Sequence, residues 1–305
     1  MKAATIITKL ARLACAAFAL AAVCATARAQ QGPQDSWTYY GVQFSSPTPA
    51  NNLSSIAIGS GGVYVGEWNS GNPTKVLRFT EAGTFVSRFN ATFTYIIGLA
   101  CDSASNVYVF DAAGPAIAVK VFDQSGTFLR QWGGPGTGDG QFRITFSSPT
   151  MIAIDRNDHV YVAESGNSRV EVFDTNGTFL RKWGQLGSLP GQFPADYPST
   201  ITVSNDGRVY AERDGYGMKV FDTNGGYLHS RTWQVFAASS DGLIFIDRDN
   251  PFELQAYKVG DASQLFSTFL QPPSGVRPVS KDAAFSKRGD LFCVSGATVS
   301  VFKRE

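Results

Sequence analysis

The chain alternates short apolar runs with polar turns, most clearly between Met151 and Gly184. Four runs of strand length are visible there: Met151–Ile154, Val160–Ala163, Val170–Phe173 and Thr178–Trp183. The runs are β-branched and aromatic, and Asn, Asp and Gly separate them, which is typical of strands. The turn Asp174–Gly177 carries Asn-Gly, which favours a hairpin because both residues tolerate positive φ. The stretch therefore predicts a four-stranded antiparallel meander.

The meander recurs along the chain, and it must, because one such sheet cannot bury both of its faces alone. Close copies flank it, and fainter copies lie further out, at Asn106–Gly133, Val209–Gly225, Ile56–Phe85, Ile244–Tyr257 and Ala283–Phe302. The last copy has three strands, and Trp37–Phe44 resembles the missing end of a repeat. A closed ring protects sheet edges. The sequence therefore predicts an all-β, six-bladed β-propeller of four-stranded antiparallel blades, with the last blade closed by the N-terminal strand.

Several motifs recur around the repeats, namely Gly140-Gln141-Phe142, Gly191-Gln192-Phe193, Gly166-Asn167-Ser168-Arg169-Val170, and the tract running from Phe173 to Gly184. These motifs resemble those of NHL-repeat six-bladed β-propellers, here of a bacterial exported kind. The resemblance implies the fold over nearly the whole mature chain. It leaves several activities open, because one propeller frame carries many. Similar propellers include zinc-dependent amidoglycolate lyases, lactonase-like enzymes with a central divalent ion, and animal proteins that bind RNA or proteins.

Residues 1–29 read as a signal peptide and residues 30–305 as the propeller. Basic residues precede an apolar run, Leu13–Ala25, and Ala27-Arg28-Ala29 is a small-x-small cleavage site. The run is too short for an ordinary membrane span. We therefore expect a periplasmic or secreted protein, monomeric and without a membrane span in the mature chain. Removing the leader leaves 22 basic against 25 acidic residues, which disfavours a nucleic-acid partner.

One face of the predicted ring carries the candidate binding groups. Short turns occupy the opposite face, whereas the segments Gly133–Phe146 and Gly184–Pro198 lengthen this one. Where each second strand ends, the copies align at Glu67, Asp111, Glu164, Arg213, Asp247 and Ser295. Such a ring could bind a cation. Alternatively, each acid caps a turn or pairs with a base such as Arg169.

We predict a binding module for a protein, peptide or small ligand rather than an enzyme. The candidate binding residues are Trp68, Asn69, Asp111, Arg143, Glu164, Asn167, Arg213, Tyr216, Asp247 and Arg248. The alternative is a lactonase-like lyase or hydrolase whose central divalent metal, such as Ca²⁺, is held by carboxylates and Asn. No cofactor and no catalytic residue is predicted. Trp132, Trp183 and Trp233, at the ends of fourth strands, are interpreted as blade-packing residues.

Overall fold

The computed structural model describes residues 37–48, 51–69, 72–112, 117–145, 151–212, 217–231, 234–238, 243–247, 254–258, 265–268 and 282–304. The strands belong to one compact unit, Ser36–Glu305. Every element among the described residues is a β-strand, so the all-β prediction is confirmed. The predicted signal peptide, residues 1–29, lies outside the described residues.

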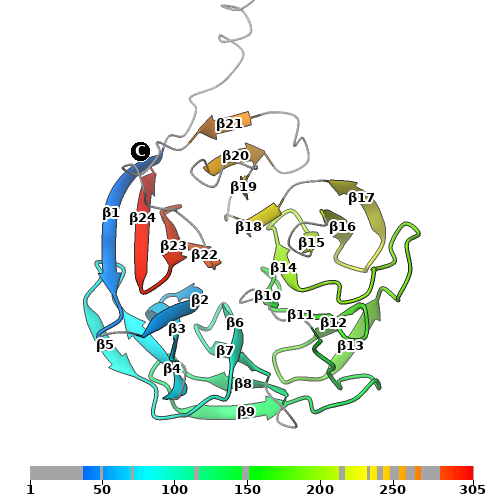
Figure 1. The fold of residues 1–305 in the computed structure, drawn as a ribbon, viewed down its shortest axis with the longest axis horizontal. Helices are drawn as coiled ribbons and strands as arrows, with labels where there is room; N and C mark the ends of the chain where they lie inside the picture. The colour runs from blue at the N-terminus through cyan, green and yellow to red at the C-terminus, as the bar shows by residue number, and fades with distance from the viewer. Residues whose placement is uncertain are drawn as a thin grey trace, which may run out of the picture. The chain divides into compact units, whose positions relative to one another are not determined.

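The strands form six four-stranded sheets (Figure 1). The first sheet contains β2 (Asn52–Gly59), β3 (Gly62–Asn69), β4 (Asn72–Phe79) and β5 (Phe85–Arg88). The second contains β6 (Ile96–Cys101), β7 (Val107–Asp111), β8 (Ala118–Phe122) and β9 (Phe128–Trp132). The third contains β10 (Ile152–Ile154), β11 (Val160–Glu164), β12 (Arg169–Phe173) and β13 (Phe179–Trp183). Neighbouring strands within each sheet are antiparallel.

The remaining sheets complete the set. The fourth contains β14 (Thr200–Val203), β15 (Arg208–Glu212), β16 (Met218–Asp222) and β17 (Tyr227–Arg231). The fifth contains β18 (Gln234–Ala238), β19 (Leu243–Asp247), β20 (Leu254–Lys258) and β21 (Leu265–Thr268). The sixth contains β22 (Asp282–Phe285), β23 (Leu291–Ser295), β24 (Thr298–Arg304) and β1 (Trp37–Ser45). The prediction of a propeller built from four-stranded antiparallel blades is confirmed.

Strand β1 joins the two ends of the described chain. It pairs antiparallel with β24, from Trp37 opposite Arg304 to Ser45 opposite Thr298, with two register irregularities. Phe44 of β1 is buried and stacks on Phe79 of the first sheet, with ring centroids 4.1 Å apart. β1 therefore contributes to the sixth sheet through its backbone and to the first sheet through a side chain.

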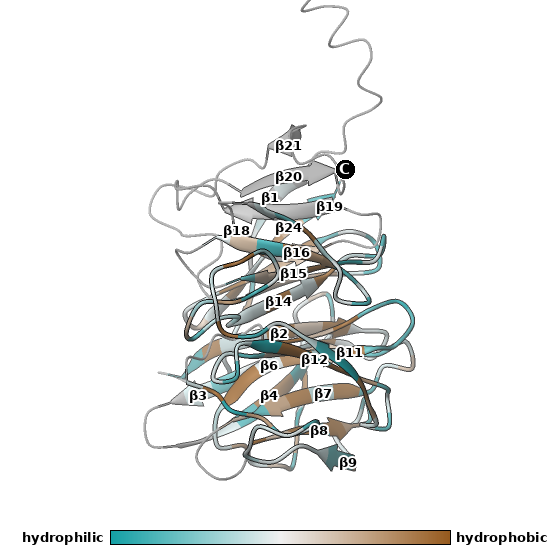
Figure 2. Cartoon of the chain, turned by 90° about the vertical axis from the view of Figure 1, so that its right-hand side faces the viewer, coloured by the Kyte–Doolittle hydropathy of each residue, from teal (hydrophilic) through white to brown (hydrophobic). Residues whose placement is uncertain are grey.

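The first strand of each sheet lies innermost. β2 contacts β6, the contacts pass through β10, β14, β18 and β22, and β22 contacts β2 again. Apolar residues line the strands, for example β6, β7 and β8, and hydrophilic residues dominate the connections (Figure 2). This arrangement buries both faces of each repeated sheet, which a single meander cannot do alone.

Large aromatic side chains at the outer edge of one sheet pack against the next sheet. Trp132 lies 5.8 Å from Phe173, and Trp183 lies 5.8 Å from Phe221, between ring centroids. Arginines two residues earlier reach the same neighbouring sheets: Arg130 Nε donates to Thr175 O at 2.7 Å, and Arg181 Nε donates to Thr223 O at 2.8 Å. The blade-packing interpretation of Trp132 and Trp183 is confirmed, whereas Trp233 lies outside the described residues.

The Asn-Gly hairpin forms, but by a geometry that differs from the expected one. Gly177 has a φ of +85°, whereas Asn176 is not in the positive-φ region. Gly177 N donates to Asp174 O at 3.1 Å, and Asp174 N donates to Thr178 O at 3.0 Å. This is a three-residue connection ending in a G1 bulge, in which glycine alone needs the left-handed conformation.

Candidate functional site

The connections between second and third strands lie beside the segments that join successive sheets. Gly166 N donates to Arg143 O at 2.8 Å, Ala112 N to Tyr95 O at 3.0 Å, and Leu53 N to Gly296 O at 2.8 Å. We call this side, where both kinds of connection meet, the loop face. The side carrying the connections between first and second strands is the turn face. The structure therefore supports the predicted division between the two faces.

The best-defined polar cluster of the loop face is centred on Arg169. Its Nε donates to Glu164 Oε1 at 2.6 Å, and its Nη2 lies 2.9 Å from Glu171 Oε1. Its Nη1 and Nη2 also donate to backbone carbonyl oxygens of the preceding segment, namely those of Thr137, Gly138 and Gln141 at 2.8, 2.9 and 3.0 Å. One guanidinium group thus holds two carboxylates and the 136–141 loop together.

The acids in this cluster have perturbed proton affinities. Burial raises the pKa of Glu171 to about 7 and that of Glu164 to about 6, while Arg169 opposes both increases. Glu171 Oε2 is buried and has no hydrogen-bond partner among the described residues. Two carboxylates share one guanidinium, so the cluster carries excess negative charge unless one of them binds a proton.

The acids at the repeated position hold the segment that precedes each sheet against the second strand of that sheet. Glu164 Oε2 accepts from Arg143 N at 3.0 Å and also from the Asn167 amide. Asp111 repeats the arrangement, with its Oδ1 accepting from Thr94 N and Tyr95 N at 2.9 Å and its Oδ2 2.7 Å from Lys120 Nζ. These contacts favour the capping and ion-pair interpretation over an open cation site.

Glu212, which the sequence analysis did not single out, also accepts a backbone hydrogen bond, but from the following sheet rather than from the segment before its own sheet. Its carboxylate accepts from Val235 N, in β18 of the next sheet, at 3.2 and 3.3 Å. Hairpin register aligns Glu212 with Ala163, one residue before Glu164. Successive side chains of a strand point to opposite faces, so the carboxylate reaches the following sheet. The one-residue offset of Glu212 from the aligned acids was therefore the feature of the sequence that could have indicated its role.

The remaining candidates are placed unevenly by the structure. Arg143 is exposed, and its backbone carbonyl oxygen is the one bonded to Gly166, while Trp68 is half-buried. Asn69 and Asp247 end strands β3 and β19, but their side chains are outside the description. Arg213, Tyr216 and Arg248 also lie outside the described residues. The structure therefore brings Arg143, Glu164 and Asn167 together and leaves Arg213, Tyr216 and Arg248 unplaced.

Two long loops of this face are structural twins. Residues 134–142 and 185–193 each close with a parallel bridge, Pro135 to Phe142 and Leu186 to Phe193. In both, a glutamine Oε1 accepts a backbone N–H three residues earlier, from Gly138 at 3.0 Å and from Leu189 at 3.1 Å. The second loop differs because leucines replace the first loop's Pro135 and Gly138. Leu186 and Leu189 are 67% and 63% exposed.

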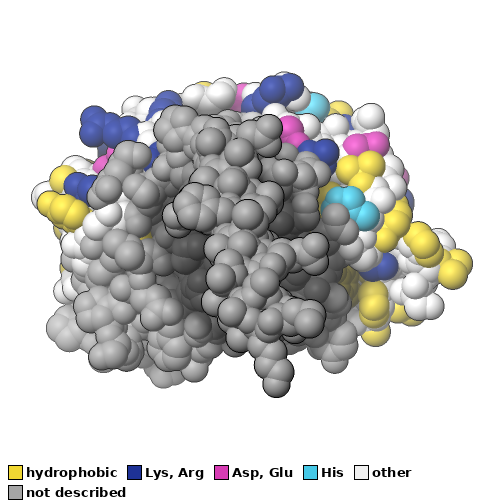
Figure 3. All heavy atoms as spheres, turned by 90° about the horizontal axis from the view of Figure 1, so that it is seen from above, with side chains coloured by type: hydrophobic (Ala, Val, Ile, Leu, Met, Phe, Trp, Pro, Cys, Tyr) yellow, Lys and Arg dark blue, Asp and Glu magenta, His cyan; other side chains and the backbone are white. Residues whose placement is uncertain are grey.

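Apolar side chains also reach solvent along the outer strands. The described residues of this kind include Tyr40, Phe85, Val86, Phe128, Leu129, Leu180 and Leu228. An edge view shows hydrophobic side chains interspersed with charged ones (Figure 3). Scattered exposure of this kind is normal for folded proteins. The pair Leu186 and Leu189 differs because the twin loop folds in the same way without them.

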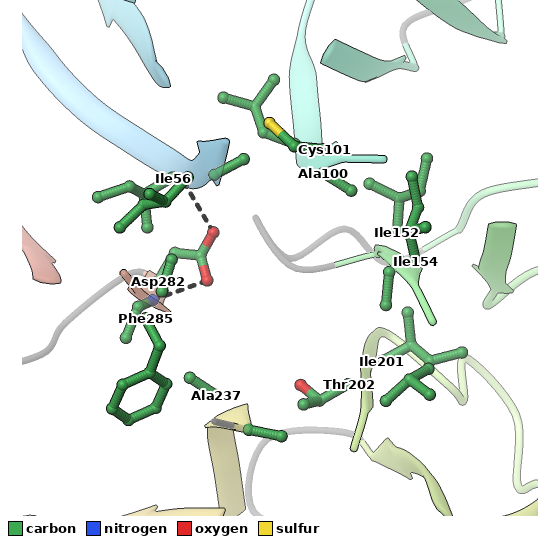
Figure 4. A pocket seen from close by; sticks show the side chains of 18 of the residues that line it. Ile56, Ala100, Cys101, Ile152, Ile154, Ile201, Thr202, Ala237, Asp282 and Phe285 are labelled. Atoms are coloured by element: carbon green, nitrogen blue, oxygen red, sulfur yellow. Dashed lines mark hydrogen bonds between the residues drawn. The ribbon is translucent and has the colours of Figure 1, made fainter. Parts of the chain in front are cut away.

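A cavity of about 340 Å³ lies among the inner strands (Figure 4). Every sheet contributes an aliphatic residue to its wall, exemplified by Ile56, Leu99, Ile152, Ile201, Ala237 and Ala283. The wall continues to Asn205, Ser286 and Lys287, which lie in connections of the turn face. None of the predicted loop-face candidates belongs to this wall as described. The short-turn side, predicted to have little room for a site, therefore borders the cavity.

The cavity wall contains one carboxylate among its described residues, that of Asp282. Its Oδ2 accepts from Ile56 N at 2.9 Å, linking the sixth sheet to the first. Burial raises its pKa well above the ordinary value for aspartate. A central Ca²⁺ requires several oxygen ligands. Among the residues that the structure describes, no three His, Cys, Asp or Glu side chains are grouped to hold a metal ion.

Cys101 and Cys293 are free, and burial raises the pKa of both thiols, which makes them poor nucleophiles. Within the described part of the chain, no helix is long and apolar enough to cross a bilayer.

Comparisons with known proteins agree with the repeat. Residues 146–173 match the family described as NHL repeat. NHL repeat-containing protein 3 of Mus musculus is 26% identical over 226 residues, covering 71% of this chain and 63% of that protein. Protein brain tumor of Drosophila melanogaster is 28% identical over 155 residues, covering 50% of this chain and 13% of that protein. The chain thus spans less than two thirds of each relative.

A further relative and a solved structure extend the comparison. Human E3 ubiquitin-protein ligase NHLRC1 is 28% identical over 113 residues, covering 34% of this chain and 28% of that protein. A streptogramin B lyase structure superposes with a TM-score of 0.53 at 12% identity, covering 88% of this chain and 98% of that structure. At that identity the likeness concerns the fold alone. The chain is a β-propeller whose residues 146–173 match the NHL repeat.

Proposed function

We propose that this chain is an exported binding module that captures a protein or peptide partner on its loop face. The observation that carries the proposal is the exposure of Leu186 and Leu189 on the 185–193 loop. The twin loop reaches the same bridge geometry with Pro135 and Gly138, so folding does not require the leucines. Burying a leucine side chain against a partner contributes about 1.5–3 kcal/mol.

The loop is held in place before any partner arrives. Phe193 is fully buried, Gln192 Oε1 accepts from Leu189 N, and Lys219 Nζ donates to Leu189 O at 3.4 Å. A preorganised apolar loop loses little conformational entropy on binding. Exposed Arg143 lies on the same loop face and could supply a polar contact to the same partner.

The proposal includes the form and location of the scaffold. It is a monomeric six-bladed propeller in the periplasm or outside the cell, closed by the N-terminal strand. The leader-like N-terminus motivates the location, and the pairing of β1 with β24 supports the closure. Protein or peptide binding fits a rigid frame with variable loops.

The test compares two pairs of leucines. Leu186→Ser with Leu189→Ser should abolish cross-linked capture of a partner from an extracellular or periplasmic extract, with little change in melting temperature. Leu129→Ser with Leu180→Ser is the matched control, because these leucines of the outer strands are 44% and 42% exposed. Loss of the same captured protein in the control pair, or retention in the loop pair, would refute the proposal.

A further inference from the structure

We propose that the axial cavity binds an aliphatic amine, with the ammonium group on Asp282 and the hydrocarbon tail against the inner strands. This site is separate from the loop face. Its volume of about 340 Å³ lies within the range of small-molecule pockets, and such pockets are largely apolar with a few orienting polar groups. Figure 4 shows the labelled side chains arranged around the central space.

The tail-binding part follows from the composition of the wall. Isoleucine, leucine, valine and alanine dominate the residues that the inner strands contribute. A hydrocarbon chain lying along the inner strands gains dispersion contacts with these aliphatic side chains.

The head-binding part follows from Asp282. The residue is 4% exposed, and its two oxygens accept from Ile56 N at 2.9 Å and Ala283 N at 2.8 Å. A carboxylate offers about four acceptor positions, so these bonds leave capacity for further donors. No described lysine or arginine pairs with it. A buried carboxylate without a counter-charge is costly, and an ammonium group supplies that charge with three donors.

The ligand's charge distinguishes an amine from other amphiphiles. An ammonium head favours the ionised form of Asp282 and pairs with it, whereas a carboxylate head fits only if Asp282 keeps a proton, and an alcohol adds a hydrogen bond without a counter-charge. Lys287, the other charged residue of the wall, is exposed where the cavity borders the turn face. Water solvates the Lys287 charge there, so Asp282 determines which ligand head group binds at the buried end of the cavity.

The experiment measures calorimetric binding of n-hexylammonium, n-hexanol and n-hexanoate to the full mature protein at neutral pH. We expect n-hexylammonium to bind most tightly, and affinity to rise about fourfold per methylene group from butyl to octyl. Asp282→Asn keeps the shape and an acceptor for Ile56 N. The variant should bind n-hexylammonium about tenfold more weakly than the wild type does, while its affinity for n-hexanol should stay within about threefold of the wild-type value.

Three further variants make the result decisive. Asp290→Asn removes one charge from the same sheet outside the cavity and should leave binding unchanged. Ala153→Phe narrows the cavity and should abolish binding even if Asp282→Asn fails to fold. Lys281→Ala, outside the described residues, should also leave binding unchanged. Equal affinity for hexanol and hexylammonium, no binding to the wild type, or tighter binding by Lys281→Ala would each overturn the proposal.

Discussion

Trp132 in β9 lies directly under Gly177 in the neighbouring sheet, where an added Cβ would come within 2.5 Å of the indole ring. Trp183 and Gly225 repeat the relationship, with a corresponding distance of 2.7 Å. Both glycines have positive φ, so two requirements coincide at one position. The glycine permits the hairpin bulge and also admits the aromatic ring of the preceding sheet.

Gly177→Ala should therefore destabilise the protein by about 3 kcal/mol, combining left-handed strain with overpacking. Gly296→Ala is the matched control, because Gly296 has a φ of +59° and nothing within 4 Å of its added Cβ. It should cost about 1 kcal/mol. Urea unfolding of both variants measures the difference, and equal losses would contradict the proposed role of Trp132.

Deleting residues 37–44 should lower the melting temperature sharply. The deletion exposes the edge of β24 and removes Phe44, which is buried against Phe79. Phe44→Ala alone should cost about 3–5 kcal/mol, whereas exposed Phe85→Ala should cost much less. Deletion of residues 30–36 is the control. An unchanged melting temperature after loss of 37–44 would show that β1 does not stabilise the propeller.

Glu171→Gln should change how stability depends on pH. Burial raises the pKa of Glu171 to about 7 from an ordinary value of 4.5, so the folded state binds more protons between these values. The free energy of unfolding therefore falls as pH rises from about 4.5 to 7. The variant should be more stable than the wild type at pH 8, on the order of 2–3 kcal/mol, and the gain should vanish near pH 4.5.

Thermal unfolding across that pH range measures the effect. Glu81→Gln serves as the control, because Glu81 is exposed and has no role in the Arg169 cluster. If the free energies of unfolding of wild type and variant differ by the same amount at every pH, Glu171 is not the source of the pH dependence.

Glu212→Ala should loosen the junction between the fourth and fifth sheets. The variant removes the acceptor for Val235 N and leaves that buried donor unsatisfied, at a cost of about 1–3 kcal/mol. Hydrogen exchange should report the loss at the Val235 amide. Glu212→Gln, which retains an acceptor, should recover part of the protection. Unaltered exchange in the alanine variant would count against this link.

The exported protein should begin after Ala29. The expectation rests on the small-x-small site that follows a basic head and an apolar run. Intact-mass spectrometry of protein recovered outside the cytoplasm should show the mass of residues 30–305. Recovery of the chain with residues 1–29 attached would contradict the cleavage.

The sequence predicted those features that repeat and missed those that arise between copies. Apolar runs and Gly turns sufficed for the strands, and their alignment located Glu164 and Asp111. Glu212 escaped notice because its function depends on which side of the strand it faces. The cavity escaped as well, since Ile152 and Ala153 resemble ordinary core residues within one copy. They become a wall where six inner strands converge.

The Arg169 guanidinium occupies the position that a bound metal ion holds in many loops, surrounded by three carbonyl oxygens and two carboxylates. Being covalently attached, this cation cannot be stripped by a chelator or exchanged for another ion. The shape of the 136–141 loop is therefore independent of the calcium concentration around the protein. Such a loop presents one constant surface whatever the ion content of its surroundings.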